Sequence, residues 1–149
     1  MTVVQETETV VVERVINASQ ETIFEMWTDA EKITTWFSAE ADLDPRAGGV
    51  MSLTMGGKVV EGEENSRLQT NGHFLVVEPY DHLEFTWGFE QERVGVPPES
   101  STVAVDLIPQ DEGTLVRVTH TGLAAGRDTS PYSERTGWGV MLERLENAL

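Results

Sequence analysis

The clearest pattern in the sequence is a strict alternation of apolar and polar positions in the middle of the chain. Leu83, Phe85, Trp87 and Phe89 are separated by single polar residues or glycine. A period of two is typical of a strand that buries one face and exposes the other. Other segments alternate in the same way or are rich in β-branched residues. Together they predict about six strands, at residues 9–16, 50–55, 70–77, 83–89, 101–108 and 114–121.

Two short helices are expected between the first and second of these strands. Ser19 and Asp29 are residue types that favour the N-cap of a helix. Between them, Ile23, Met26 and Trp27 follow the i, i+3, i+4 spacing of one helical face. The sequence therefore predicts one helix after Ser19 and a second, short helix that opens at Asp29 and runs through Trp36 and Phe37.

The C-terminal segment shows the other strong helical pattern. Over residues 131–149 the apolar side chains share one broad helical face, and the glutamates and arginines fall mostly outside it. The residues of this face are Trp138, Met141, Leu142, Leu145 and Leu149. No other segment offers an apolar face of this size, so we expect the terminal helix to cover the sheet.

The order of the elements decides the fold class. A run of consecutive strands flanked by helices argues for an α+β fold with an antiparallel sheet rather than an α/β fold. A chain of 149 residues suits a single domain, 1–149, and it shows no repeat, linker or low-complexity tract. The chain is long enough to bury a core, and a cavity within it, without covalent cross-links.

Composition narrows the range of partners. The chain has 26 acidic and 10 basic residues, for a formal net charge of −16, and such a surface repels nucleic acids and anionic lipids. It has no cysteine, which excludes disulfides and thiolate sites. No apolar stretch is long enough to span a membrane, and the first residues do not resemble a secretory signal. We expect a cytoplasmic protein with an acidic, solubilising surface.

Five motifs in the same order resemble the START-like (SRPBCC) superfamily, in the branch named after the Hsp90 ATPase activator homologue. They cover nearly the whole chain. The motifs are the opening VINASQETIFEMWTDAEKITTWF (15–37), the turn DPRAGG (44–49), NGHFLVVEPYDHLEFTW (71–87), the pair STVAVDLIP (101–109) with GTLVRVTHTGL (113–123), and GWGVMLERLENAL (137–149). The resemblance implies the helix-grip fold, in which a curved antiparallel sheet surrounds a long C-terminal helix.

The resemblance also implies an apolar cavity between the sheet and the terminal helix. Binding pockets are mostly apolar with a few polar groups, but the same side chains could instead fill the space completely. The residues predicted to line this ligand cavity are Trp36, Met51, Leu53, Met55, His73, Leu75, Phe85, Trp87, Val103, Val105, Val118, His120, Trp138, Met141, Leu142 and Leu145.

The histidines are the main candidates for chemistry. His120 lies on the apolar register of its strand, where it could act as an acid or base or serve as a hydrogen-bonded structural residue. His73 belongs to the predicted lining, although a bulge near Asn71 and Gly72 would change its direction. His82, in a turn, is expected to be solvated. The spacing of the three histidines does not indicate a metal site, and no glycine motif indicates a nucleotide or other cofactor.

Three functions follow from these observations, and none of them assigns a catalytic residue. The first is binding of a small hydrophobic molecule in the cavity. The second is an enzyme of the cyclase, aromatase or hydrolase type that acts on such a molecule. The third, suggested by the name of the family branch, is a co-chaperone that activates a chaperone ATPase. A homodimer is a further possibility that the sequence leaves open.

Overall fold

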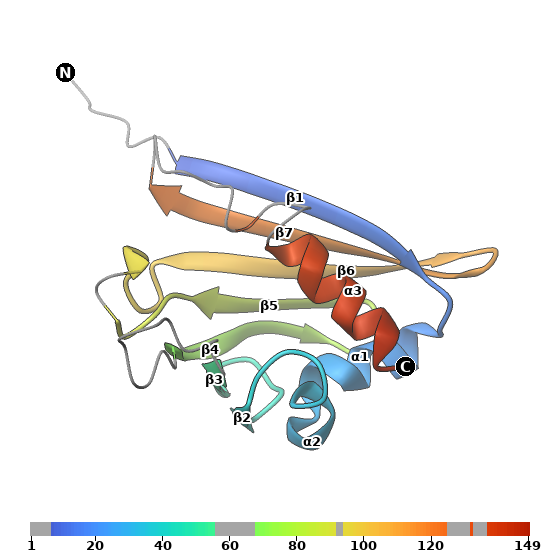
Figure 1. The fold of residues 1–149 in the computed structure, drawn as a ribbon, viewed down its shortest axis with the longest axis horizontal. Coiled ribbons are helices and arrows are strands. Elements are labelled where there is room, and N and C mark those ends of the chain that lie inside the picture. Colours follow the sequence, from blue (N-terminus) through green and yellow to red (C-terminus); the bar gives the residue numbers. More distant parts are fainter. Residues whose placement is uncertain (1–6, 56–67, 92–93, 125–131, 133–136) are drawn as a thin grey trace, which may run out of the picture.

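The computed structural model describes residues 7–55, 68–91, 94–124, 132 and 137–149. Seven strands and three helices follow one another along this part of the chain (Figure 1). In chain order they are β1 (Thr7–Ile16), α1 (Gln20–Thr28), α2 (Ala30–Ile33), β2 (Glu40–Leu43), β3 (Val50–Met55), β4 (Leu68–Glu78), β5 (His82–Trp87), β6 (Ser101–Gln110), β7 (Gly113–Ala124) and α3 (Trp138–Asn147).

The strands form one antiparallel sheet in the order β1-β7-β6-β5-β4-β3-β2. This confirms the α+β helix-grip fold, with seven strands in place of the six expected. The additional strand is β2, which pairs with β3 through contacts such as Leu43 opposite Met51. It is a four-residue edge strand with no buried residue, so it lacks the alternation that reveals the others.

Strand β1 joins the sheet out of sequence order. It pairs with β7, and Val12 lies opposite Val118. The other neighbouring strands in the sheet are successive in the chain. The first strand therefore forms one edge and β2 forms the other.

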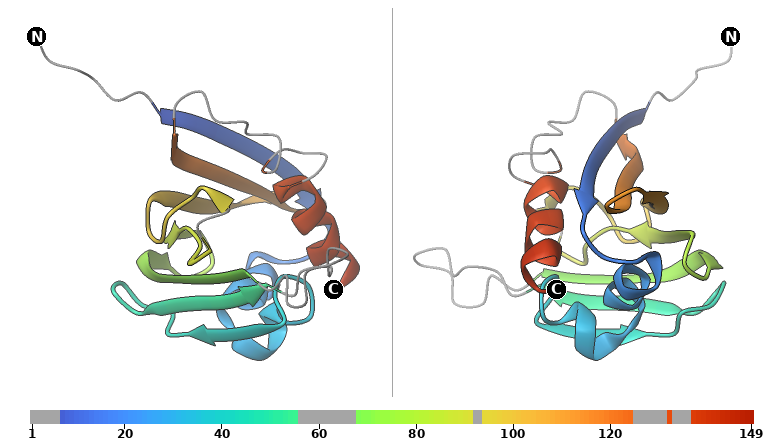
Figure 2. Two further views of the ribbon diagram at one scale, coloured as in Figure 1. Left: turned by 60° about the vertical axis from the view of Figure 1, so that its left-hand side comes forward. Right: turned by 90° about the vertical axis from the view of Figure 1, so that its right-hand side faces the viewer.

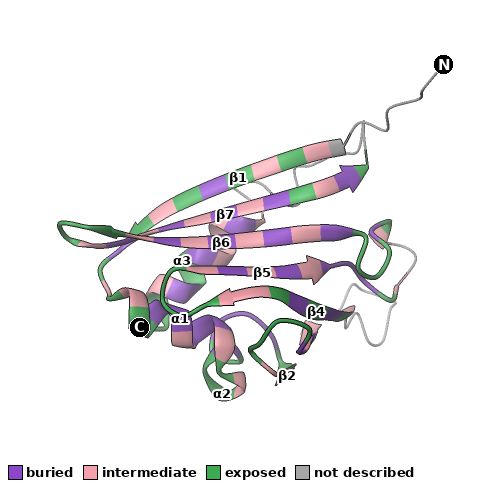
Figure 3. Cartoon of the chain, turned by 180° about the vertical axis from the view of Figure 1, so that it is seen from behind, coloured by how far each residue is buried: buried purple, intermediate pink, exposed green. Residues whose placement is uncertain are grey.

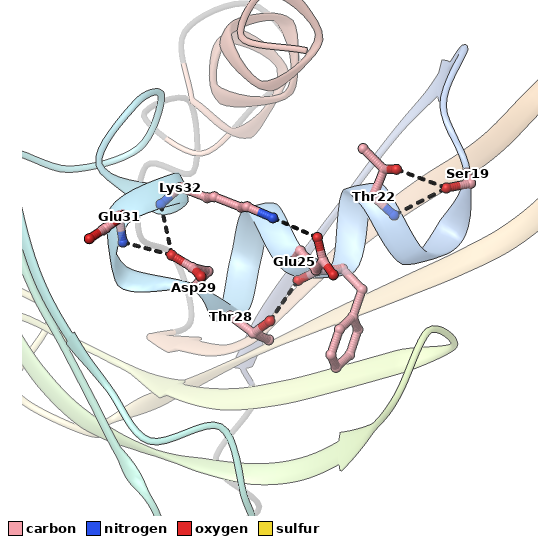
Figure 4. Close-up of polar contacts among 8 residues, drawn as sticks. Ser19, Thr22, Glu25, Thr28, Asp29, Glu31 and Lys32 are labelled. Carbon is pink, nitrogen blue, oxygen red and sulfur yellow. Dashed lines mark hydrogen bonds and ion pairs between the residues drawn. The ribbon is translucent and has the colours of Figure 1, made fainter.

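Helices α1 and α2 begin at the two predicted N-caps (Figure 4). The Ser19 hydroxyl accepts a 3.1 Å hydrogen bond from the backbone N–H of Thr22. The Asp29 carboxylate accepts bonds of 2.9 and 3.1 Å from the backbone N–H groups of Glu31 and Lys32. These caps satisfy donors that would lack partners at a helix start.

Helix α2 ends at Ile33, so the prediction that it continues through Trp36 and Phe37 is wrong. Those two residues belong to the segment after α2, which leads into the pocket described below.

Helix α3 lies across the concave face of the curved sheet, as Figure 2 shows from two directions. Its buried residues are Trp138, Leu142 and Leu145, three of the five expected. Leu149 was predicted wrongly: it follows the helix and the residue is 46% exposed. The helix begins at Trp138, and the earlier residues 131 and 133–136 of the expected helix lie outside the described part of the chain.

The inner face of the sheet forms the core. Buried and half-exposed positions alternate along β5, β6 and β7, as the sequence pattern predicted (Figure 3). The inward side chains of these strands and of α1 and α3 belong to one hydrophobic cluster. Burial of this apolar surface is the main force that holds the helix against the sheet.

A β-bulge in β4 changes which of its side chains face inward. Phe74 pairs with Phe85 and Val76 with Glu84, so Leu75 is the extra residue. Before the bulge the even-numbered residues are buried, and His73 faces outward. The inward assignments of His73 and Leu75 are therefore wrong: Leu75 is 46% exposed as a residue, and the side chain of His73 is 54% exposed.

Candidate ligand-binding pocket

An apolar pocket of about 240 Å³ opens between α3, the end of β5 and the segment after α2. In the described part of the chain, its walls combine aromatic, methionine and valine side chains with one charged residue, Arg144. The lining residues are Phe37, Met55, Trp87, Phe89, Tyr132, Gly137, Trp138, Val140, Met141 and Arg144.

Aromatic rings in mutual contact build the walls of this pocket. The ring centroids of Trp87 and Trp138 lie 5.4 Å apart, and Phe37 lies 5.9 Å from Trp87 and 5.7 Å from Trp138. Phe89 contacts Trp87 edge-on at 5.4 Å. Such pairs are favourable beyond the area that they bury, so the rings hold one another in place. The aromatic side chains that form the pocket wall are thus held in position by their packing against one another.

Four of the predicted cavity residues line this pocket: Met55, Trp87, Trp138 and Met141. The remaining inward residues do not line it and are packed in the hydrophobic core. Those core residues are Met51, Leu53, Phe85, Val103, Val105, Val118, Leu142 and Leu145. Much of the space expected to be a cavity is therefore filled by side chains, and this pocket lies at one end of it.

The sequence reasoning missed several lining residues. Phe89 was recognisable, since it continues the alternation of β5 beyond the last hydrogen-bonded residue. Arg144 lies three residues after Met141 on the same helix, but a charged residue was assigned to the solvent side. Val140 flanks the same helical stripe. Tyr132 is buried but lies outside any described helix or strand, so no periodicity could place it.

A second, more polar hollow of about 500 Å³ adjoins the pocket, and the two share Phe37 and Arg144. It lies between the segment after α2 and the end of α3. Trp36, predicted as a cavity residue, lines this hollow rather than the apolar pocket, and its indole N–H donates to the carbonyl oxygen of Met26 at 2.9 Å. The other residues of the hollow are Thr34, Thr35, Ser38, Ala39, Asn147 and Ala148.

His120 is fully buried and hydrogen-bonded at both ring nitrogens. The indole N–H of Trp138 lies 3.2 Å from Nδ1, and Ser101 Oγ lies 2.8 Å from Nε2. Because an indole N–H can only donate, Nδ1 accepts and the ring proton is on Nε2. That proton is donated to Ser101, whose hydroxyl donates in turn to the carbonyl oxygen of Trp87 at 2.9 Å.

This chain of hydrogen bonds bears on catalysis. A serine next to a histidine resembles an activated nucleophile, in which the histidine removes the hydroxyl proton. Here Nε2 of His120 already carries a proton, and the proton of Ser101 points to a backbone carbonyl. His120 is also absent from the lining of the apolar pocket. The arrangement is that of a buried structural histidine.

The other two histidines lie away from the pocket. His82 was expected to be solvated, but its side chain is only 23% exposed and lies between Asp106 at 2.6 Å and Glu84 at 2.9 Å. Partial burial by itself lowers the pKa of His82, but the hydrogen bonds and negative charges of the two carboxylates outweigh it and raise the pKa. His73 contacts Glu99 at 2.5 Å and lowers the pKa of that carboxyl.

Within the described residues, no group of three or more histidine or acidic side chains is arranged to hold a metal ion. The described helices also include none that is both long and apolar enough to cross a membrane.

Fold and pocket together define the class: a helix-grip domain with an apolar pocket under its C-terminal helix. The chain belongs to the activator of Hsp90 ATPase homolog 1-like family, whose model matches residues 17–149. This confirms the branch of the START-like superfamily that the sequence motifs indicated. A comparison with curated proteins found no match.

Several solved structures share the fold. Protein MLL2253 from Mesorhizobium loti is 26% identical with a TM-score of 0.73, over 95% of this chain and 96% of that one. Protein CV1439 from Chromobacterium violaceum is 18% identical with a TM-score of 0.76, over 93% and 94% of the two chains. DynU16, from the dynemicin biosynthetic locus, is 24% identical with a TM-score of 0.68, over 93% of this chain and 46% of its own.

Proposed function

We propose that this protein binds a small, mainly apolar molecule in the pocket between α3, β5 and the segment after α2. The observation that supports this most directly is the state of Trp87 in the pocket wall. Its indole N–H is buried and has no hydrogen-bond partner. Buried donors in proteins are nearly always satisfied, so a partner from outside the chain accounts for this one.

The lining suits this role. Binding pockets are predominantly apolar and aromatic, with a small number of polar groups that fix the orientation of the ligand. The pocket of about 240 Å³ is slightly smaller than the roughly 300–1,000 Å³ that is usual for drug-sized ligands. A ligand of that size would therefore extend through the shared residues into the adjoining hollow.

Native mass spectrometry of the full chain, with a panel of hydrophobic probes, tests the proposal. Met141→Trp places a larger side chain in the pocket and is expected to abolish probe binding, since the added ring occupies the space that the probe needs. The control is Leu149→Trp, which makes a similar change at an exposed position outside both cavities. Absence of binding by the folded wild-type chain would overturn the proposal.

Two other hypotheses remain from the sequence. An enzyme that used His120 as an acid or base would need a ring nitrogen free to exchange protons with a ligand, and the hydrogen bonds of His120 do not favour this. A co-chaperone role rests on the name of the family alone. Measuring the ATPase rate of a chaperone with and without the protein tests it directly.

A further inference from the structure

The cavity pair has an unusual distribution of charge. The chain carries a net charge of −16, yet none of the described residues that line the apolar pocket or the adjoining hollow is acidic. Among the lining residues that the structure describes, Arg144 is the one with a charge, and it belongs to both cavities. The junction between the two cavities is therefore a positive site on a strongly negative protein.

Arg144 also differs from the other cations in the described part of the chain. There, Arg14, Lys32, Arg46 and Arg117 each form an ion pair with a nearby carboxylate, at distances of 2.6–2.9 Å. No such pair is formed by Arg144. Arg144 lies in the last turn of α3. This position is favourable for a cation, because the free carbonyl groups at the C-terminus of a helix carry partial negative charge. That effect does not explain why the described walls of both cavities lack acidic side chains.

Each of the two cavities that share Arg144 also has a buried, unpaired donor in its wall. The hydroxyl of Ser38, in the hollow, and the indole N–H of Trp87, in the pocket, are both more than nine-tenths buried and have no hydrogen-bond partner. Together with the Arg144 guanidinium they offer hydrogen-bond donors and no negative charge. Such a set matches a ligand group that accepts hydrogen bonds and carries negative charge.

From this arrangement we infer that the ligand is a monocarboxylate with an apolar body. The inference rests on the proposed function and specifies its ligand. The apolar body occupies the pocket lined by Trp87, Trp138 and Met141. The carboxylate lies at the junction of the two cavities and pairs with the Arg144 guanidinium, whose planar donors suit a carboxylate.

The test compares three probes of equal chain length: decanoate, decan-1-ol and decyltrimethylammonium. Binding to the full chain is followed by tryptophan fluorescence, since Trp87 and Trp138 line the pocket. Decanoate is expected to bind about fivefold more tightly than decanol, the preference expected from one exposed ion pair. The cationic probe is expected to bind most weakly. The preference should shrink at high salt.

Arg144→Gln is expected to reduce the affinity for decanoate to that for decanol and to leave decanol unchanged. The control, Arg46→Gln, removes the same charge from a turn outside both cavities and should keep the preference. Equal binding of decanoate and decanol by the wild type, or an unchanged preference in Arg144→Gln, overturns the inference alone. If none of the probes binds to the folded protein, the proposed function fails with it.

Discussion

The indole N–H of Trp138, at the first residue of α3, donates a hydrogen bond to Nδ1 of His120 on β7. The two rings meet nearly edge-on, with centroids 6.0 Å apart. This contact ties the start of the helix to the inner face of the sheet at a fully buried position. It also places one wall of the pocket, because Trp138 lines the pocket and His120 lies behind it.

His120→Phe is expected to lower the free energy of unfolding by about 2–4 kcal/mol, because two hydrogen bonds are lost and the Trp138 donor is left buried without an acceptor. Urea denaturation at neutral pH measures this. The matched substitution His73→Phe, on the exposed face, should change stability by less than about 0.5 kcal/mol. Equal effects of the two substitutions would show that the His120 network contributes little.

Asp29→Ala is expected to destabilise the protein by about 1 kcal/mol, because two backbone N–H groups at the start of α2 lose their acceptor. Asp29→Asn retains an acceptor oxygen and should remain close to the wild type. Thermal and urea unfolding of the three proteins provide the comparison. An asparagine variant as unstable as the alanine variant would show that the charge, rather than the cap, is what matters.

The environment of His82 indicates that the folding stability of the protein depends on pH. Its pKa is raised in the folded protein by Glu84 and Asp106, so the folded state binds the proton more tightly than the unfolded state does. This contribution is fully present below the unfolded pKa of about 6.5 and is lost as the pH rises through the higher folded value.

His82→Gln should therefore cost more stability near pH 6 than near pH 9, because the wild-type imidazole loses its proton, and with it this stabilisation, as the pH rises. Urea unfolding of both proteins at the two pH values measures the difference. A cost that is the same at both values would contradict the assignment of a raised pKa.

Gly88 lies directly after β5, at a position where we expect that no side chain is tolerated. A Cβ atom there would collide with the backbone of Pro97 and Pro98. Gly88→Ala is expected to cost about 2–4 kcal/mol and to weaken probe binding, because the neighbouring Phe89 lines the pocket. Gly48→Ala is the control: its φ of +82° strains an alanine by about 1–2 kcal/mol, but no atom crowds the new group.

The features that the sequence predicted correctly are local. Ser19 and Asp29 cap helices because a short polar side chain reaches donors two or three residues ahead, and such contacts depend only on neighbouring residues. The alternation in β5 likewise follows from the geometry of a single strand. The helix caps and the alternation can therefore both be recognised from a few consecutive residues.

The wrong predictions concern side chains whose direction depends on how their strand pairs with a neighbouring strand. If alternation is counted back from the inward-facing Val77, it places Leu75 and His73 on the inner face. The bulge at Leu75, visible only in the pairing with β5, reverses this register. The extent of the pocket is less predictable still, because it depends on where packed side chains leave space. That is why half of the sixteen residues predicted to line the cavity are packed in the core instead.

The pairing of β1 with β7 has a consequence for how the protein is made. Val12 leaves the ribosome early, but its partner Val118 is synthesised about a hundred residues later. Until β7 emerges, β1 has an unpaired edge and nothing to cover its apolar face. Long-range strand pairing of this kind slows folding and leaves exposed edges open to aggregation. We therefore expect β1 to join the sheet after translation of β7, as a late step in folding.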